Sequence, residues 1–176
     1  MPFSYYDRLS ARGQAIYRKS SAVEEIRLPR PELLRPFVGD LREALARDQR
    51  PLVEAAASRL VAGLSAMLET PPVHVKVLAV RPSRSWGELH GLYTIEDGAP
   101  PVIRVWMRTA RRRRVVAFRT FLRTLLHEVV HHLDYTLLRL PESFHTEGFF
   151  KRESSLFRQL VPDAGSEAAP RLQEAK

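Results

Sequence analysis

A chain of 176 residues has the length of one ordinary domain, and its lack of cysteine excludes disulfides and thiolate metal ligands, which leaves histidine and carboxylate to hold any metal. Its hydrophobic residues, 44% of the total, suit a single core, while the absence of a long apolar run or a secretory leader favours a cytoplasmic protein without a membrane partner. The net charge of +8, mostly from arginine, favours DNA or another polyanion as a partner, unless the arginines are simply scattered over a solvated surface.

The first 70 residues are predicted to be helical. A first helix is expected within residues 4–20, and a second over 32–46, interrupted near Pro36 and restarted with Asp40 as its N-cap. A third is expected over 52–68, where apolar residues recur at three- and four-residue steps after a proline. These segments form the helical N-terminal part of the domain.

The pattern then changes to an alternation of apolar and polar residues, which predicts strands. Three short strands are expected over 73–79, 89–95 and 102–107, and the loop over 96–100 joins the last two as a hairpin. The sequence therefore predicts an α+β fold in which a small antiparallel three-stranded sheet packs on the helix that follows it. One edge of this sheet could hold an extended peptide by backbone hydrogen bonds.

Two residues of the hairpin carry groups that can stabilise a developing oxyanion. His90 and Tyr93 are candidates for this transition-state role, and the alternative for each is a structural place in the sheet.

A run of arginine precedes the central helix. The positive end of the helix dipole lies here, so helix stability does not account for the run. We interpret it as a phosphate-contacting patch for nucleic acid or as a partner of acidic groups elsewhere in the fold. The run consists of Arg108, Arg111, Arg112, Arg113 and Arg114.

The segment from Val115 to Leu140 is strongly periodic and free of glycine and proline, which predicts a helix. His127 and His131, four residues apart, fall on one face of it and can share a metal. Glu128 lies at the edge of that face, where a carboxylate can activate a water on the metal.

Asp134, three residues after His131, returns to the histidine face and can accept the outer N–H of a ligand imidazole. The pattern indicates metal-assisted hydrolysis. Its alternative is an amphipathic helix that only happens to carry histidines.

A catalytic metal needs a third protein ligand, and His145 is the favoured candidate. Pro141 ends the helix, and the chain must then turn back sharply, or the helix must unwind a turn early, for His145 to reach the metal. Glu147 and Glu153 are the competing third ligands, the latter in a further helix expected over 149–160.

These residues resemble the SprT-like zinc metallopeptidase domain over about residues 73–160. The shared pattern is His127-Glu128-x-x-His131, followed by His145 and then by aromatic residues at 149 and 150. The glycine that follows the third histidine in that family is displaced here to Gly148, and the family's C-terminal cysteine zinc ribbon is absent.

The resemblance implies a β-hairpin before the active-site helix, one zinc ion per chain and a protein or peptide substrate, with relatives that act on proteins crosslinked to DNA. We therefore expect a zinc metallopeptidase with Glu128 as general base, in one domain over residues 1–162, with a mobile tail over 163–176. The alternatives are a metal-dependent ribonuclease and a non-catalytic zinc-stabilised module that binds nucleic acid.

Overall fold

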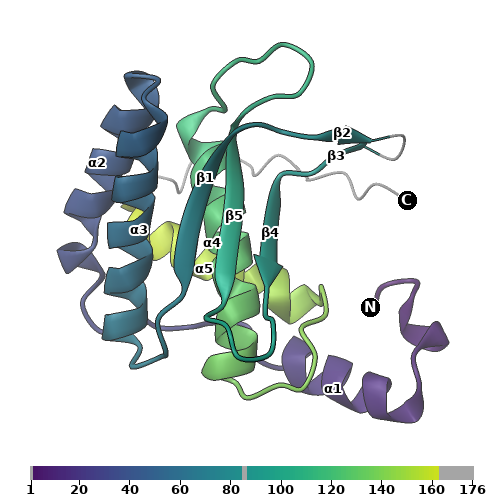
Figure 1. Cartoon of the computed structure of the whole chain (residues 1–176). Helices are drawn as coiled ribbons and strands as arrows, with labels where there is room; N and C mark the ends of the chain where they lie inside the picture. Colours follow the sequence, from purple (N-terminus) through teal and green to yellow (C-terminus); the bar gives the residue numbers. More distant parts are fainter. Residues whose placement is uncertain (1, 85–86, 163–176) are drawn as a thin grey trace.

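The computed structural model describes residues 2–84 and 87–162 and has the predicted α+β class (Figure 1). The tail predicted over 163–176 lies outside the described residues. None of the helices in the two described ranges has the length and apolar character that crossing a bilayer requires. In chain order the 3-10 turns (η), helices and strands are η1 (Tyr6–Arg8), α1 (Ala11–Ser21), η2 (Pro31–Leu33), α2 (Arg35–Ala46), α3 (Arg50–Met67), β1 (His74–Val80), β2 (Ser83–Arg84), β3 (Gly87–Glu88), β4 (Gly91–Thr94), β5 (Val102–Arg108), α4 (Phe118–Thr136) and α5 (Glu147–Leu160).

Three strands form the main sheet in the order β1-β5-β4. β4 and β5 form the predicted antiparallel hairpin, with Gly91 opposite Val105. β1 runs parallel to β5, with Val75 opposite Ile103, so the prediction of an antiparallel sheet is wrong for this pair and the sheet is mixed. The reason is that β5 takes the central position, where its Ile103, Val105 and Met107 are fully buried, and this separates β1 from β4.

One face of the sheet carries the core side chains and packs on α4, which passes behind it in Figure 1. In β1, Val75 and Val77 are buried while His74 and Lys76 are exposed, as an alternation of period two predicts. α2 and α3 pack on each other beside β1, α5 packs on α4, and α1 packs on α5. The central helix is thereby enclosed between the sheet and α5.

Two predictions for the N-terminal helices need correction. α2 runs unbroken from Arg35 to Ala46, so the predicted restart at Asp40 is wrong. Pro36 lies in the first turn of α2, where its missing N–H breaks no helical hydrogen bond. The first predicted helix divides into η1 and α1 because Ser10 caps α1 by accepting a hydrogen bond from the Gly13 N–H.

α4 ends at Thr136, one turn before Leu140, and this early end lets the chain turn back towards α4. Arg139 takes a left-handed conformation (φ 52°), and the N–H of Leu140 donates to the Asp134 carbonyl at 2.9 Å. This tight turn sends the chain back towards His145. The prediction that the helix unwinds early is confirmed.

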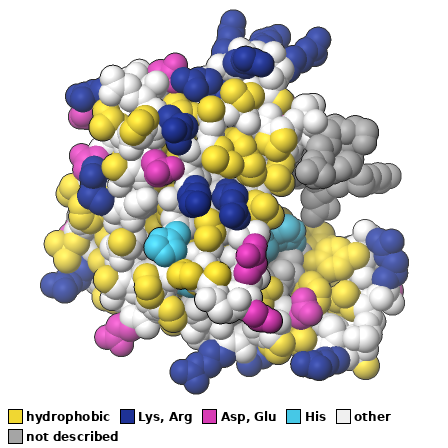
Figure 2. All heavy atoms as spheres, viewed as in Figure 1, with side chains coloured by type: hydrophobic (Ala, Val, Ile, Leu, Met, Phe, Trp, Pro, Cys, Tyr) yellow, Lys and Arg dark blue, Asp and Glu magenta, His cyan; other side chains and the backbone are white. Residues whose placement is uncertain are grey.

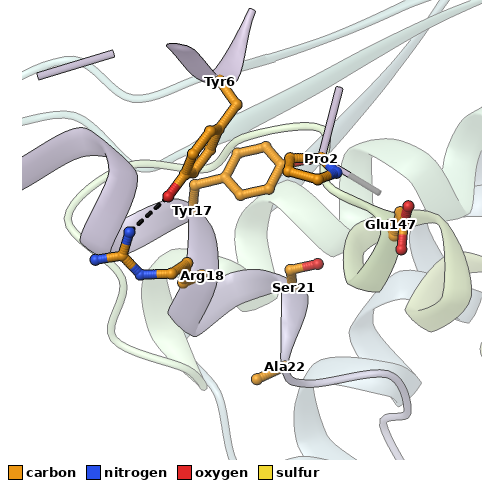
Figure 3. A pocket seen from close by; sticks show the side chains of 7 residues that line it. All are labelled: Pro2, Tyr6, Tyr17, Arg18, Ser21, Ala22 and Glu147. Carbon is orange, nitrogen blue, oxygen red and sulfur yellow. Dashed lines mark hydrogen bonds between the residues drawn. The ribbon is translucent and has the colours of Figure 1, made fainter. Parts of the chain in front are cut away.

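The N-terminal segment lies beside the start of α5. The Phe3 N–H donates to the Tyr17 hydroxyl at 3.0 Å, and the Tyr5 hydroxyl donates to the carbonyl of His145 at 2.6 Å. A hollow of about 380 Å³ opens between this segment, α1 and Glu147 (Figure 3). The first residues of the chain thus contact the loop that carries the third histidine.

α1 and α5 approach each other closely at Gly148. A methyl group at this position would lie 2.6 Å from the carbonyl oxygens of Ser20 and Ser21 at the end of α1. Thr146 caps α5 by accepting from the Phe149 N–H at 3.0 Å. The displaced glycine therefore has a packing role in joining the two helices.

We predict that Gly148→Ala destabilises the protein by about 2 kcal/mol, because the added methyl group forces α1 away from α5. The measurement is the free energy of unfolding from urea denaturation. Gly39→Ala is the matched control, because a methyl group there meets nothing within 4 Å and raises the helix propensity of α2. Equal stability of the Gly148→Ala variant and the wild type would contradict this packing role.

Candidate metal centre

Three histidine side chains converge at one point between α4 and the loop before α5. His127 and His131 extend from adjacent turns of α4, and His145 comes from the loop. The Nε2 atom of His145 lies 3.0 Å from the Nε2 atoms of both other rings. Tetrahedral metal sites with bonds of about 2.0–2.1 Å separate ligand nitrogens by about 3.3 Å, so this group can hold a metal ion.

The hydrogen bonds of His131 determine which of its nitrogens carries the proton. The Ser143 hydroxyl donates its single hydrogen to Asp134 Oδ2 at 2.8 Å. Its oxygen lies 2.7 Å from His131 Nδ1 and therefore accepts the Nδ1–H. Nε2 of His131 is left with a lone pair that points at the other two rings, as a metal ligand requires.

Glu153 is the hydrogen-bond partner of the outer nitrogen, Nδ1, of His127. Its Oε2 atom lies 3.0 Å from His127 Nδ1, and its other oxygen lies 3.7 Å from an Arg123 nitrogen. Glu153 is thus a hydrogen-bond partner of one histidine, on the side away from the point where the three rings meet. Glu147 lies in the first turn of α5, and among the described residues neither glutamate belongs to the metal-binding group.

The electrostatics of the group also favour metal binding. Burial, followed by the charge of neighbouring histidines, lowers the pKa of His131 to about 2 and that of His145 to about 4. Both rings are therefore neutral near pH 7, and a histidine must be neutral to bind a metal.

The predicted contact of Asp134 with a ligand imidazole is indirect. Ser143 lies between Asp134 and His131, and the second oxygen of Asp134 accepts from Arg152 Nη2 at 2.8 Å. Asp134 and Arg152 are both completely buried. The sequence reasoning missed Ser143, a single loop serine without a distinguishing pattern. It also missed Arg152, although an arginine three residues after Phe149 on an apolar helix face is a signal.

Glu128 is buried against the edge of the sheet. A methyl group on Gly91 of β4 would collide with its carboxylate, so the two residues are in tight contact. Burial raises the pKa of Glu128 to about 7, while the charge of His127 and the backbone N–H of Tyr93 act in the opposite direction. The carboxylate of Glu128 therefore lies between α4 and β4.

The other two candidates from the hairpin differ in position. The Tyr93 ring stacks near His131, with 6.5 Å between ring centroids, and its hydroxyl lies 3.0 Å from Nδ1 of His132. The other nitrogen of His132 contacts the Pro71 carbonyl, so it donates there and accepts the Tyr93 hydroxyl hydrogen. Burial lowers the pKa of His90, and within the described residues the charges that act on it are those of Arg81 and Glu88.

The arginine run divides in two. Arg108 forms an ion pair with Asp48, which realises the predicted contact with an acidic group. Arg111, Arg112, Arg113 and Arg114 are exposed in the loop between β5 and α4, at the end of the molecule where Figure 2 shows a cluster of basic side chains. His127 lies about 14 Å along α4 from its first residue, so this loop does not line the histidine group.

Comparison of the chain with family models, curated proteins and solved structures finds no match. The resemblance to the SprT-like domain therefore rests on the motif in the sequence.

We predict that His145→Ala loses the bound metal, while Glu153→Ala keeps one ion at saturating metal with an affinity reduced by about 10–100-fold. The difference arises because His145 contributes a ligand nitrogen and Glu153 only orients His127. Elemental analysis and chelator competition measure both quantities. His74→Ala, which removes an exposed histidine of β1, is the control. Loss of metal in Glu153→Ala with retention in His145→Ala would reverse the two roles.

Proposed function

We propose that this chain is a zinc-dependent metallopeptidase of the SprT-like type, with one zinc ion held by His127, His131 and His145. The observation that carries the proposal is the convergence of three imidazole nitrogens with Glu128, the neighbour of the first histidine, buried beside β4. Within the described residues the group has three members, and three protein ligands leave the fourth position that a catalytic zinc uses. Imidazole ligands accept several divalent ions, and availability and the motif favour zinc.

Zinc in such a site lowers the pKa of water and polarises a substrate carbonyl. Glu128 takes the proton of the attacking water and later delivers it to the leaving amine. Burial raises the pKa of the Glu128 carboxyl in the metal-free protein, and a bound cation would lower it again, which keeps the group ionised and able to accept a proton.

The position of β4 supports a peptide as the substrate. β4 is an edge strand of the sheet, and an extended peptide can pair with such an edge through backbone hydrogen bonds. Gly91 of this strand contacts Glu128, so a peptide on β4 would pass close to the general base. Backbone pairing holds a chain of any sequence, and the exposed Leu92 offers one apolar contact to its side chains.

We predict that Glu128→Gln retains zinc and loses peptidase turnover by about 10²–10⁴-fold, because the amide has no basic oxygen for the proton of water. Casein hydrolysis by the zinc-loaded protein, beside elemental analysis, measures the two properties. Wild-type rates in a Glu128→Gln variant with bound zinc would rule out the mechanism.

The exposed arginine loop over 111–114 favours a second candidate function, a metal-dependent hydrolase of RNA. The same loop would also suit a peptidase that is held on nucleic acid while it cuts protein. RNA cleavage that disappears in Glu128→Gln, without casein hydrolysis in the wild type, would favour the ribonuclease. Zinc binding and salt-sensitive DNA binding without either activity would instead favour the non-catalytic module.

We predict that Gly91→Ala lowers kcat/KM by about 10²-fold without loss of zinc. The new methyl group would collide with the carboxylate of Glu128 and displace it from its position in the site. Gly39→Ala, which adds a methyl group in open space, is the control. Peptide turnover and zinc content are measured for both variants. Full activity in Gly91→Ala would show that the contact with Glu128 has no part in catalysis.

A further inference from the structure

A continuous set of hydrogen bonds, buried around Arg152 and partly buried at Ser143, begins at the end of α1 and passes through Arg152. One guanidinium nitrogen, Nη1, donates to the carbonyls of Ser20 at 2.6 Å and Val23 at 2.5 Å. The other, Nη2, donates to the Ser20 hydroxyl at 3.0 Å and to Asp134 at 2.8 Å. Ser20, Asp134 and Arg152 have no exposed surface, so water does not compete for the bonds among these three residues.

The later bonds follow from an ionised Asp134, which the positive charge of Arg152 favours. Oδ1 of this carboxylate accepts from Arg152, and Oδ2 accepts from the Ser143 hydroxyl. Ser143 has a single hydrogen and must then accept from Nδ1 of His131. The set of bonds ends with one tautomer of His131, whose Nε2 lone pair faces the other histidines.

The same end of α1 also contacts the loop of the third histidine. The Ser20 hydroxyl lies 3.3 Å from the Thr146 hydroxyl, directly after His145. Tyr5 holds the His145 carbonyl from the N-terminal segment. Two of the three histidines are thus oriented by contacts that lead to residues before position 24.

We propose that Arg152, acting through Asp134 and Ser143, is a positioning residue that fixes the tautomer and ring orientation of His131 for metal binding. α1 thereby belongs to the outer shell of the metal centre. The inference rests on the metal site of the proposed function and does not require the peptidase activity.

The alternative role of these bonds is purely structural, to join α1, α4 and α5. The two roles differ at Ser143, which lies in the loop after α4 and contacts only Asp134 and His131 in the set of bonds. Removal of its hydroxyl leaves the contacts of Arg152 with α1 and with Asp134 in place. Ser143 therefore separates histidine positioning from helix docking.

The test compares full-length Ser143→Ala and Ser143→Thr with the wild type. The control is Ser154→Ala, a partly exposed serine of α5 outside the set of bonds. Zinc affinity is measured by chelator competition, the tautomer of His131 by ¹⁵N NMR of the metal-free protein, and stability by thermal unfolding of the metal-free protein.

In Ser143→Ala we expect zinc affinity to fall by about 10–100-fold, the Nδ1–H tautomer of His131 to lose its dominance, and the unfolding temperature of the metal-free protein to stay near that of the wild type. Ser143→Thr, which keeps the hydroxyl, restores the tautomer and most of the affinity. Arg152→Lys, which keeps the charge but loses the planar fork, weakens zinc binding in the same direction.

Zinc affinity within about twofold of the wild type and an unchanged tautomer in Ser143→Ala would overturn the inference. A fall in the stability of metal-free Arg152→Lys without a change in the tautomer of His131 would also overturn it, in favour of the structural role. A wild type that binds zinc but hydrolyses no peptide overturns the proposed function alone, whereas a wild type that binds no zinc overturns both.

Discussion

The buried ion pair between Arg152 and Asp134 constrains the arrangement of three helices. Both side chains are completely buried, and burial raises the pKa of Asp134 while the charge of Arg152 opposes that rise. Removal of one partner of such a pair leaves an uncompensated charge, which typically costs about 3–5 kcal/mol. The pair is satisfied only when α4, α5 and the end of α1 meet at one point. The positions of His131 and of the loop that carries His145 follow from that meeting.

The local patterns of the sequence were sufficient for the elements that position the site. The apolar periodicity of residues 115–140 predicted α4, the spacing of His127 and His131 predicted a shared face, and period-two alternation predicted the β4–β5 hairpin. Each of these depends on residues close together in the chain. The position of His145 is also a local matter, because the helix ends before Pro141 and only a few residues then lead back to the other two histidines.

The features of the sheet and of the site that sequence reasoning missed depend mainly on contacts between distant segments. The parallel pairing of β1 with β5 follows from which strand takes the centre of the sheet, and no local pattern of β1 determines that. Glu153 was a candidate ligand, but whether a carboxylate reaches the metal or the far nitrogen of His127 depends on how α5 packs on α4. The contacts of Arg152 arise in the same way, with α1, more than a hundred residues earlier.

The exposed arginines lie just before the start of α4, whereas the metal-binding histidines of α4 lie further along the helix. The arginines at 111–114 precede the helix, and His127 lies about 14 Å beyond its first residue, whereas ions screen exposed charges over about 8 Å at physiological ionic strength. The pKa of Glu128 is accordingly governed by its burial and by His127, without a contribution from the loop. For the proposed peptidase, a polyanion bound to the exposed arginines would therefore act by holding substrate near β4 and would leave the proton affinity of Glu128 unchanged.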